Sequence, residues 1–250
     1  MKADKALKRL AAILLALAVW QGVAMIINNR LLLASPVHVA GRLAAVIADK
    51  SFLKSVAFSF SRIIGGFFAA LGAGIILAVA AGRFGIIETL LWPYMITIKA
   101  VPVASFIVLA LIWFTSSTLS AFTSFLMVLP VVYTNVLEGI KSIDKKLTDM
   151  ADVFRVPWSR RLLYIWLPKI KPFLISSCSV ALGLSWKAGI AAEVIGIPEG
   201  SIGEKLYYAK VYLNSADLLA WTLVIVALSV AFEKLFVLAL KKTFGRLERL

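Results

Sequence analysis

Six long apolar stretches dominate this 250-residue sequence. Each approaches the length that a helix needs to cross the roughly 30 Å hydrocarbon core of a bilayer, because a helix rises about 1.5 Å per residue. Lipid offers the backbone no hydrogen-bond partners, so helices are the expected form of these segments. The sequence therefore predicts an all-α, polytopic membrane protein with six transmembrane helices. The stretches are residues 10–27, 55–81, 100–114, 119–140, 173–197 and 218–240.

Composition agrees with a protein of the lipid bilayer. Hydrophobic residues make up 61% of the chain, whereas a soluble chain is about 45–50% apolar. The net charge of +14 is compatible with nucleic acid or a membrane surface, but the apolar stretches favour the membrane, and no nucleic-acid partner is expected. The first stretch exceeds the 7–15-residue core of a typical signal peptide, so we expect an uncleaved helix.

The chain lacks the residues that most catalytic and metal sites use. Cys178 is the only cysteine and His38 the only histidine, whereas a zinc site usually needs three or four Cys, His or carboxylate ligands. A Ser-His-Asp site would depend on His38 alone. No G-x-x-x-x-G-K-[ST] phosphate loop is present, so the chain is not expected to bind ATP. We therefore expect a transport subunit without a cofactor rather than an enzyme.

Basic residues in the connections predict the orientation, because they favour the cytoplasmic side. Six spans place both ends and the connection between the fourth and fifth spans on one side, and all three are rich in Lys and Arg. We therefore expect a protein of the inner or plasma membrane with both termini in the cytoplasm. The outer connection disagrees, and an amphipathic helix in the membrane interface would account for it. Its basic residues are Arg30, Arg42, Lys50 and Lys54.

Two spans have unusual features. The third stretch is short, so it either starts earlier, near Pro93, or is a broken helix, and both Pro93 and Pro102 favour a kink. In the second stretch, small residues recur at every fourth position, which lets another helix approach one face closely. The pattern does not separate packing within the chain from packing between chains. The small residues are Gly66, Ala70, Gly74, Ala78 and Gly82.

Charged residues within or beside the spans are candidates for a pathway or an intramembrane network. A charge near the bilayer centre costs at least about 2.5–3.5 kcal/mol on insertion scales, so it usually faces protein or water. Lys187 and Glu193 lie about 240° apart round a helix, so we do not expect them to pair. Lys187 either lines a pathway and attracts an anion or bonds to a carboxylate or carbonyl of the bundle. Arg62 and Lys99 are expected to extend towards an interface.

The connection at residues 141–172 is basic and too polar to span. Leu147, Ala151 and Phe154 have the spacing of one helix face, and Pro157 ends that helix. The short helix would offer its apolar face, chiefly Ala151 and Phe154, to a cytoplasmic partner. Alternatively, it lies on the headgroups with its lysines near anionic lipid, and the spacing alone does not decide between the two.

This connection resembles the EAA loop of bacterial ABC importer permeases, which reads E-A-A, three residues, G, nine residues and I-x-L-P. Residues 165–168 match the end of that pattern, Ala151 matches its third position, and Asp149 keeps an acidic first position. Arg155 occupies the glycine position. The resemblance implies a coupling helix that contacts an ATPase. The residues implied are Leu147, Asp149, Met150, Ala151, Asp152, Phe154, Arg155, Pro157, Trp158, Ile165, Leu167 and Pro168.

Other segments resemble the permeases of nitrate, sulfonate and taurine transport. They are residues 59–62, 66–67, 99–104, 112–114, 138–144, 183–188 and 192–196. The resemblance implies two cytoplasmic ABC ATPase subunits, an extracytoplasmic solute-binding protein and a second permease chain, identical or related. It also implies a small anionic or organic solute.

The chain is accordingly divided into three parts. Residues 1–54 hold the first transmembrane helix and the outer amphipathic connection, residues 55–240 form the permease core with five transmembrane helices, and residues 241–250 form a basic cytoplasmic tail. The alternative function is a secondary transporter or channel that works without ATP. Such transporters more often show internal repeats and acidic residues at mid-membrane, and the sequence shows no clear repeat.

Overall fold

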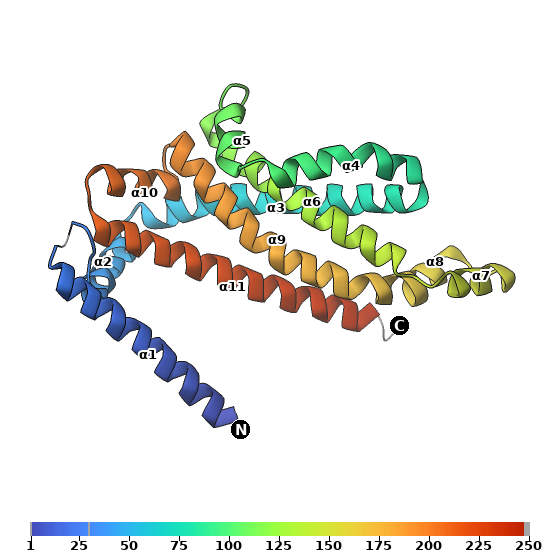
Figure 1. Ribbon diagram of the computed structural model, residues 1–250, viewed down its shortest axis with the longest axis horizontal. Coiled ribbons are helices and arrows are strands. Elements are labelled where there is room, and N and C mark those ends of the chain that lie inside the picture. The colour runs from blue at the N-terminus through green and yellow to red at the C-terminus, as the bar shows by residue number, and fades with distance from the viewer. Residues whose placement is uncertain (1, 30, 248–250) are drawn as a thin grey trace.

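The computed structural model describes residues 2–29 and 31–247, and every regular element in these ranges is a helix. The predicted all-α class is therefore confirmed (Figure 1). Five segments are long and apolar enough to cross a membrane. They are α1 (Lys2–Ile27), α3 (Phe52–Arg83), α6 (Ser116–Lys141), α11 (Ser215–Leu247), and the continuous run of α8 (Trp158–Arg161), a π-helical turn (Leu162–Trp166) and α9 (Leu167–Gly196).

The third predicted span is a broken helix. Helix α4 (Gly85–Ala100) and helix α5 (Val103–Ala110) meet at 102°, and counting this pair as one span gives six within the described residues. Val101 has an extended backbone before Pro102, as expected because the residue preceding a proline avoids the helical region. The break therefore falls at Pro102, whereas Pro93 lies inside α4.

Helices α3, α6 and α9 form the core of the bundle, and α11 lies alongside α9 (Figure 1). The row of small residues on α3 packs against α6 of the same chain. A methyl group added at Gly66 would lie 2.2 Å from the carbonyl oxygen of Ala121, and one at Gly74 would lie 2.9 Å from Val132 Cβ. The sequence left open whether this packing lies within or between chains, and the structure places it within the chain.

Two short helices stand at the end of the bundle where α3 begins and α9 ends (Figure 1). Helix α2 (Pro36–Ala48) falls in the predicted amphipathic connection, with Ser35 as its N-cap and Pro36 in its first turn, both favoured there. Helix α10 (Ile202–Val211) was not predicted. Its signal is the spacing of Ser201 and Glu204, which is that of a capping box.

An ion pair fixes α2 to the start of α11. Arg42 Nη2 donates to Asp217 Oδ2 at 3.0 Å, and Arg42 Nε donates to Asp217 Oδ1. The hydrogen bond to Asp217 raises the pKa of the Arg42 guanidinium above its ordinary value. Arg42 was one of the residues that contradicted the predicted orientation, and its charge is paired here.

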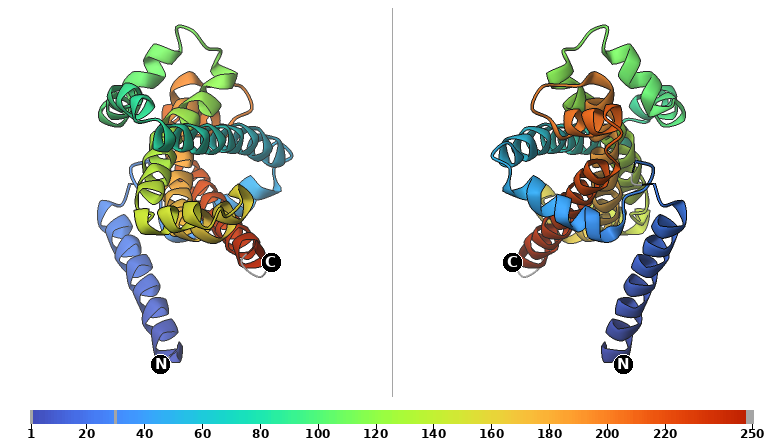
Figure 2. Two further views of the ribbon diagram at one scale, coloured as in Figure 1. Left: turned by 90° about the vertical axis from the view of Figure 1, so that its right-hand side faces the viewer. Right: turned by 90° about the vertical axis from the view of Figure 1, so that its left-hand side faces the viewer.

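Helix α1 diverges from the other helices (Figure 2). A hydrogen bond of 3.2 Å, from Trp20 Nε1 to the carbonyl oxygen of Ala34, joins α1 to the connection before α2. Side chains such as Leu14 are exposed along it. The side chains of residues 1–6, 9, 30 and 246–250 lie outside the described part, including several basic residues on which the predicted orientation depends.

Candidate functional site

The predicted coupling loop projects beyond the ends of α6 and α9, opposite α2 and α10 (Figure 1). Its first element is α7 (Lys145–Val153). Asp144 is the N-cap, and its side chain accepts a 2.9 Å hydrogen bond from the Lys146 amide. Asp is among the preferred N-caps because its carboxylate satisfies an amide that the helix leaves free. The predicted helix is confirmed, and it begins two residues before Leu147.

Helix α7 ends in a Schellman motif. The Val156 amide donates to the Ala151 carbonyl at 2.9 Å, and the Arg155 amide donates to the Asp152 carbonyl at 3.0 Å. Arg155 itself has φ 49°, in the left-handed region, where glycine is usual because it has no Cβ. Arg155 is also the residue at the glycine position of the EAA pattern. The turn therefore has the shape that glycine would favour, with an arginine in its place.

Arg161, which was not predicted as a site residue, holds this turn in place. Its Nε donates to the Val156 carbonyl at 2.7 Å, its Nη2 to the Ala151 carbonyl at 2.8 Å, and its Nη1 to the carboxylate of Asp152. Basic side chains can satisfy the carbonyls that a helix leaves free at its C-terminus. Arg161 lies ten residues after Ala151, so helical spacing gave no signal for the contact.

The exposed apolar face of the loop differs from the predicted one. Ala151 is fully buried, so the expectation that it faces a partner is wrong: its helix face is turned towards the chain's own turn and Arg161. Three exposed apolar side chains lie together near the end of α7: Met150, Val153 and Phe154, with Val153 78% and Phe154 74% exposed. We call these three residues the coupling face.

The remaining predicted loop residues connect the coupling face to the membrane spans. Pro157 is the N-cap of α8, and the rings of Trp158 and Trp166 meet edge to face at 5.3 Å. Ile165 and Leu167 are half-buried where the π-helical turn joins α9. Leu147, Asp149 and Pro168 are exposed.

Glu193 is buried at the opposite end of the bundle. Its Oε2 accepts hydrogen bonds from Ser59 Oγ at 2.6 Å and from the Gly203 amide at 3.2 Å. Lys187 is exposed, and none of the ion pairs among the described residues includes it. The hydrogen-bond partners of the buried Glu193 carboxylate are therefore Ser59 and Gly203, whereas Lys187 lies on the exposed side of the same helix.

The other two predicted charges bond to neutral oxygens. Lys99 Nζ donates to Thr134 Oγ1 at 2.8 Å, beside a groove of about 230 Å³ between α4 and α6. At the far end of that groove, Lys141 and Glu88 form an ion pair at 2.6 Å. Arg62 Nε donates to the carbonyl of Ser117.

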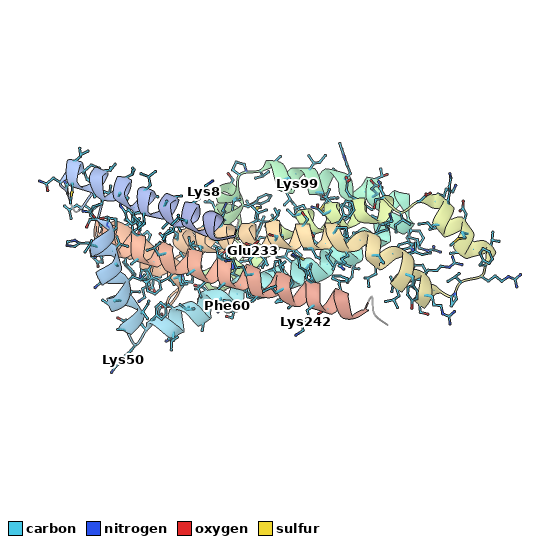
Figure 3. The ribbon with its side chains drawn as sticks, turned by 90° about the horizontal axis from the view of Figure 1, so that it is seen from below. Lys8, Lys50, Phe60, Lys99, Glu233 and Lys242 are labelled. Carbon is cyan, nitrogen blue, oxygen red and sulfur yellow. The ribbon has the colours of Figure 1, made fainter. Side chains whose placement is uncertain are left out.

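Sequence reasoning missed a second intramembrane acid, Glu233 on α11. Ser179 on α9 donates a hydrogen bond to its carboxylate, and Figure 3 shows Glu233 part-way along α11 where that helix runs beside α9. The signal was a carboxylate within a predicted span, which usually has a protein partner. In the described part of the chain, no three His, Cys, Asp or Glu side chains are grouped to hold a metal ion.

A bundle of apolar spans with a polar helical loop at one end is the architecture of a multi-pass membrane protein. The family model described as "Binding-protein-dependent transport system inner membrane component" matches residues 70–246. The chain therefore belongs to this family of ABC transporter permeases. It is a non-catalytic transport subunit of the inner membrane.

Several named permeases are similar to this chain. A putative ABC transporter permease of Methanocaldococcus jannaschii is 23% identical over 86% of this chain and 82% of its own length. A putative aliphatic sulfonates transport permease of Bacillus subtilis is 25% identical, covering 74% and 67%. The taurine transport system permease of Escherichia coli is 26% identical, covering 87% and 81%.

Proposed function

We propose that this chain forms the solute pathway of an ATP-driven importer and couples to a separate cytoplasmic ATPase through its loop. The coupling face carries this proposal: Met150, Val153 and Phe154 are exposed apolar residues on a short helix whose end is fixed by Arg161. Exposed apolar side chains on a rigid element are suited to a protein partner, because buried aromatic anchors often dominate binding energy. The alternative is that the same face rests on lipid headgroups.

Co-purification with the ATPase separates these alternatives. Val153→Glu places a charge in the coupling face, and losing a central contact typically costs about 2 kcal/mol or more. We expect the variant to insert normally but to lose the ATPase. Ser159→Glu is the matched control, because Ser159 is exposed in the same loop but outside the coupling face. Full ATPase binding, with full solute-stimulated ATP hydrolysis by the ATPase bound to the Val153→Glu permease, would favour the lipid alternative.

The remaining partners follow from the family. A binding-protein-dependent system includes an ATPase and a binding protein, and we propose that a second permease chain completes the pathway. Six spans, with α4 and α5 counted as one, would place both termini on the side of the coupling loop, which we propose is the cytoplasm.

We propose a small anionic solute, of the kind named for the sulfonate relative. Lys99 and Lys187 support this, because both are exposed on membrane-spanning elements and neither is neutralised by a carboxylate among the described ion pairs. A lysine on a membrane-spanning element usually faces protein or water rather than lipid. A pathway lined by such residues would attract anions.

A further inference from the structure

Four helices converge on one buried polar cluster at the end of the bundle opposite the coupling loop. Ser59 comes from α3, Ser120 from α6, Glu193 from α9 and Gly203 from α10. All four residues are buried, and Ser59, Ser120 and Glu193 are 0% exposed. A carboxyl group in such a position contacts no solute, so a role in lining the pathway does not account for Glu193.

The Ser59 hydroxyl connects three of these helices. It donates to Glu193 Oε2 at 2.6 Å and accepts the Ile202 amide at 2.9 Å, while the Gly203 amide donates to the same Glu193 oxygen at 3.2 Å. Ile202 and Gly203 form the first turn of α10, whose amides have no partners within the helix. The positive end of the helix dipole also favours a carboxylate at this point. Glu193 and Ser59 therefore hold α10 by the first amides of its backbone.

Helix α10 also lies very close to α9 at this point. A Cβ added at Gly203 would be 2.2 Å from Glu193 Cβ and 2.5 Å from the Glu193 carbonyl carbon. Only glycine allows this approach. Ser120 lies beside Glu193, and neither Ser120 Oγ nor Glu193 Oε1 has a hydrogen-bond partner in the described part of the chain. The carboxyl group thus contacts α3, α6 and α10 from its position on α9.

We propose that Glu193 is a positioning residue, and that with Ser59 it forms a latch that makes α10 move together with α3 and α9 during transport. Helix α10 carries exposed aromatic and basic side chains, including Tyr208, Lys210 and Tyr212 at its end. A force applied to that surface reaches the spans through the latch. The role in transport rests on the proposed importer function, whereas the latch itself is a property of the isolated chain.

Hydrogen exchange tests the latch without any partner. In the detergent-purified permease, the Ile202 and Gly203 amides should exchange slowly, and Glu193→Leu should raise their exchange rate about tenfold, because the Gly203 amide loses its hydrogen-bond acceptor. Ser59→Ala should have a similar effect. Glu193→Gln should restore protection, since its amide oxygen can accept from Ser59 and Gly203. Glu199→Leu is the control, because Glu199 is an exposed acid in the α9–α10 connection.

Unchanged exchange in both Glu193→Leu and Ser59→Ala would overturn the latch. Equal loss of protection in Glu193→Gln and Glu193→Leu would also overturn it, because charge rather than hydrogen-bond geometry would then hold α10. If Glu193→Leu does not fold, Ser59→Ala and Glu193→Gln still test the latch. Amide exchange can be measured on any variant that can be purified.

ATP hydrolysis by the assembled importer tests the mechanical role. Ser59→Ala and Glu193→Leu should keep basal hydrolysis but lose several-fold stimulation by the solute-loaded binding protein, and Glu193→Gln should retain it. Normal stimulation despite rapid amide exchange would show that α10 does not transmit movement. Absence of ATPase association in the unmutated chain would instead refute the importer function, and the exchange result would still stand.

Discussion

Arg161 Nη2 donates a 2.8 Å hydrogen bond to the carbonyl oxygen of Ala151, ten residues earlier in the chain. Together with its bonds to Val156 and Asp152, this contact fixes the orientation of the coupling face. Arg161→Met should disorder the loop, because it removes hydrogen bonds worth at least about 1.5 kcal/mol. We expect faster cleavage of the loop by thermolysin and loss of ATPase co-purification. The neighbouring exposed Arg160 provides the control, and equal effects of Arg160→Met and Arg161→Met would contradict this role.

Arg155→Gly should stabilise the same loop. Arg155 has φ 49°, a left-handed conformation that is strained for any residue with a Cβ. Glycine removes this strain but loses more conformational entropy when the loop folds. We expect a net gain in loop stability of about 0.5–1 kcal/mol. Thermolysin should then cut the loop about two- to fivefold more slowly. Arg155→Ala removes the same charge without relieving the backbone and should give no such protection. Equal protection in both variants would mean that the charge, not the backbone, destabilises the turn.

Gly74→Ala should destabilise the bundle. The new methyl group would lie 2.9 Å from Val132 Cβ, and overpacking of this kind typically costs about 1–3 kcal/mol. Unfolding of the purified protein in mixed micelles measures the change. Gly72→Ala serves as the control on the same helix, because nothing lies within 4 Å of a Cβ there. Wild-type stability of Gly74→Ala would show that α3 and α6 can separate at little cost.

Single-cysteine labelling tests the proposed orientation. Cys178 is the only cysteine and is buried, so Cys178→Ala provides a background without reactive thiols. A membrane-impermeant maleimide added outside cells should label Lys50→Cys but not Lys8→Cys or Lys242→Cys. These three lysines are exposed, and Figure 3 shows Lys50 at the end of the molecule near α2 and Lys242 near the C-terminal end of α11. Outside labelling at either terminal position would contradict the six-span arrangement.

Lys99→Met should weaken transport of anions. Methionine has a side chain of similar length to lysine, so it keeps the packing beside Thr134 but removes the positive charge. We expect a several-fold rise in KM for sulfonate uptake by reconstituted importer, with nitrate and taurine as further probes. Thr134→Val, which removes the hydrogen-bond partner of Lys99 but keeps its charge, should have a smaller effect. An unchanged KM in Lys99→Met would place Lys99 outside the pathway.

Local patterns predicted most of the helices. Apolar length predicted α1, α3, α6, α9 and α11. Pro93 and Pro102 both predicted a kink, and the break between α4 and α5 falls at Pro102. Helix α10 was not predicted, because it is too short and too polar for a span. The spacing of Ser201 and Glu204 was its signal in the sequence.

The arrangement around the candidate site was harder to predict. The spacing of Leu147, Ala151 and Phe154 indicated a shared face, but Arg161 folds back over that helix and buries Ala151 instead. The partners of Glu193 come from α3 and α10, more than one hundred and about ten residues away respectively. Such contacts depend on how the helices assemble, and no periodicity within one helix encodes them.

The close approach of α3 to α6 limits where this protein can change shape. Between Gly66 and Gly82, added methyl groups would meet Ala121, Val132 and Ile140 at 2.2–2.9 Å, so the two helices cannot slide past one another without a clash. Alternating exposure of a solute to the two sides of the membrane therefore cannot come from shear within this pair. If the chain forms the proposed pathway, the change in exposure would come instead from a hinge at the break between α4 and α5, which meet at 102°, or from movement of the chain as a whole.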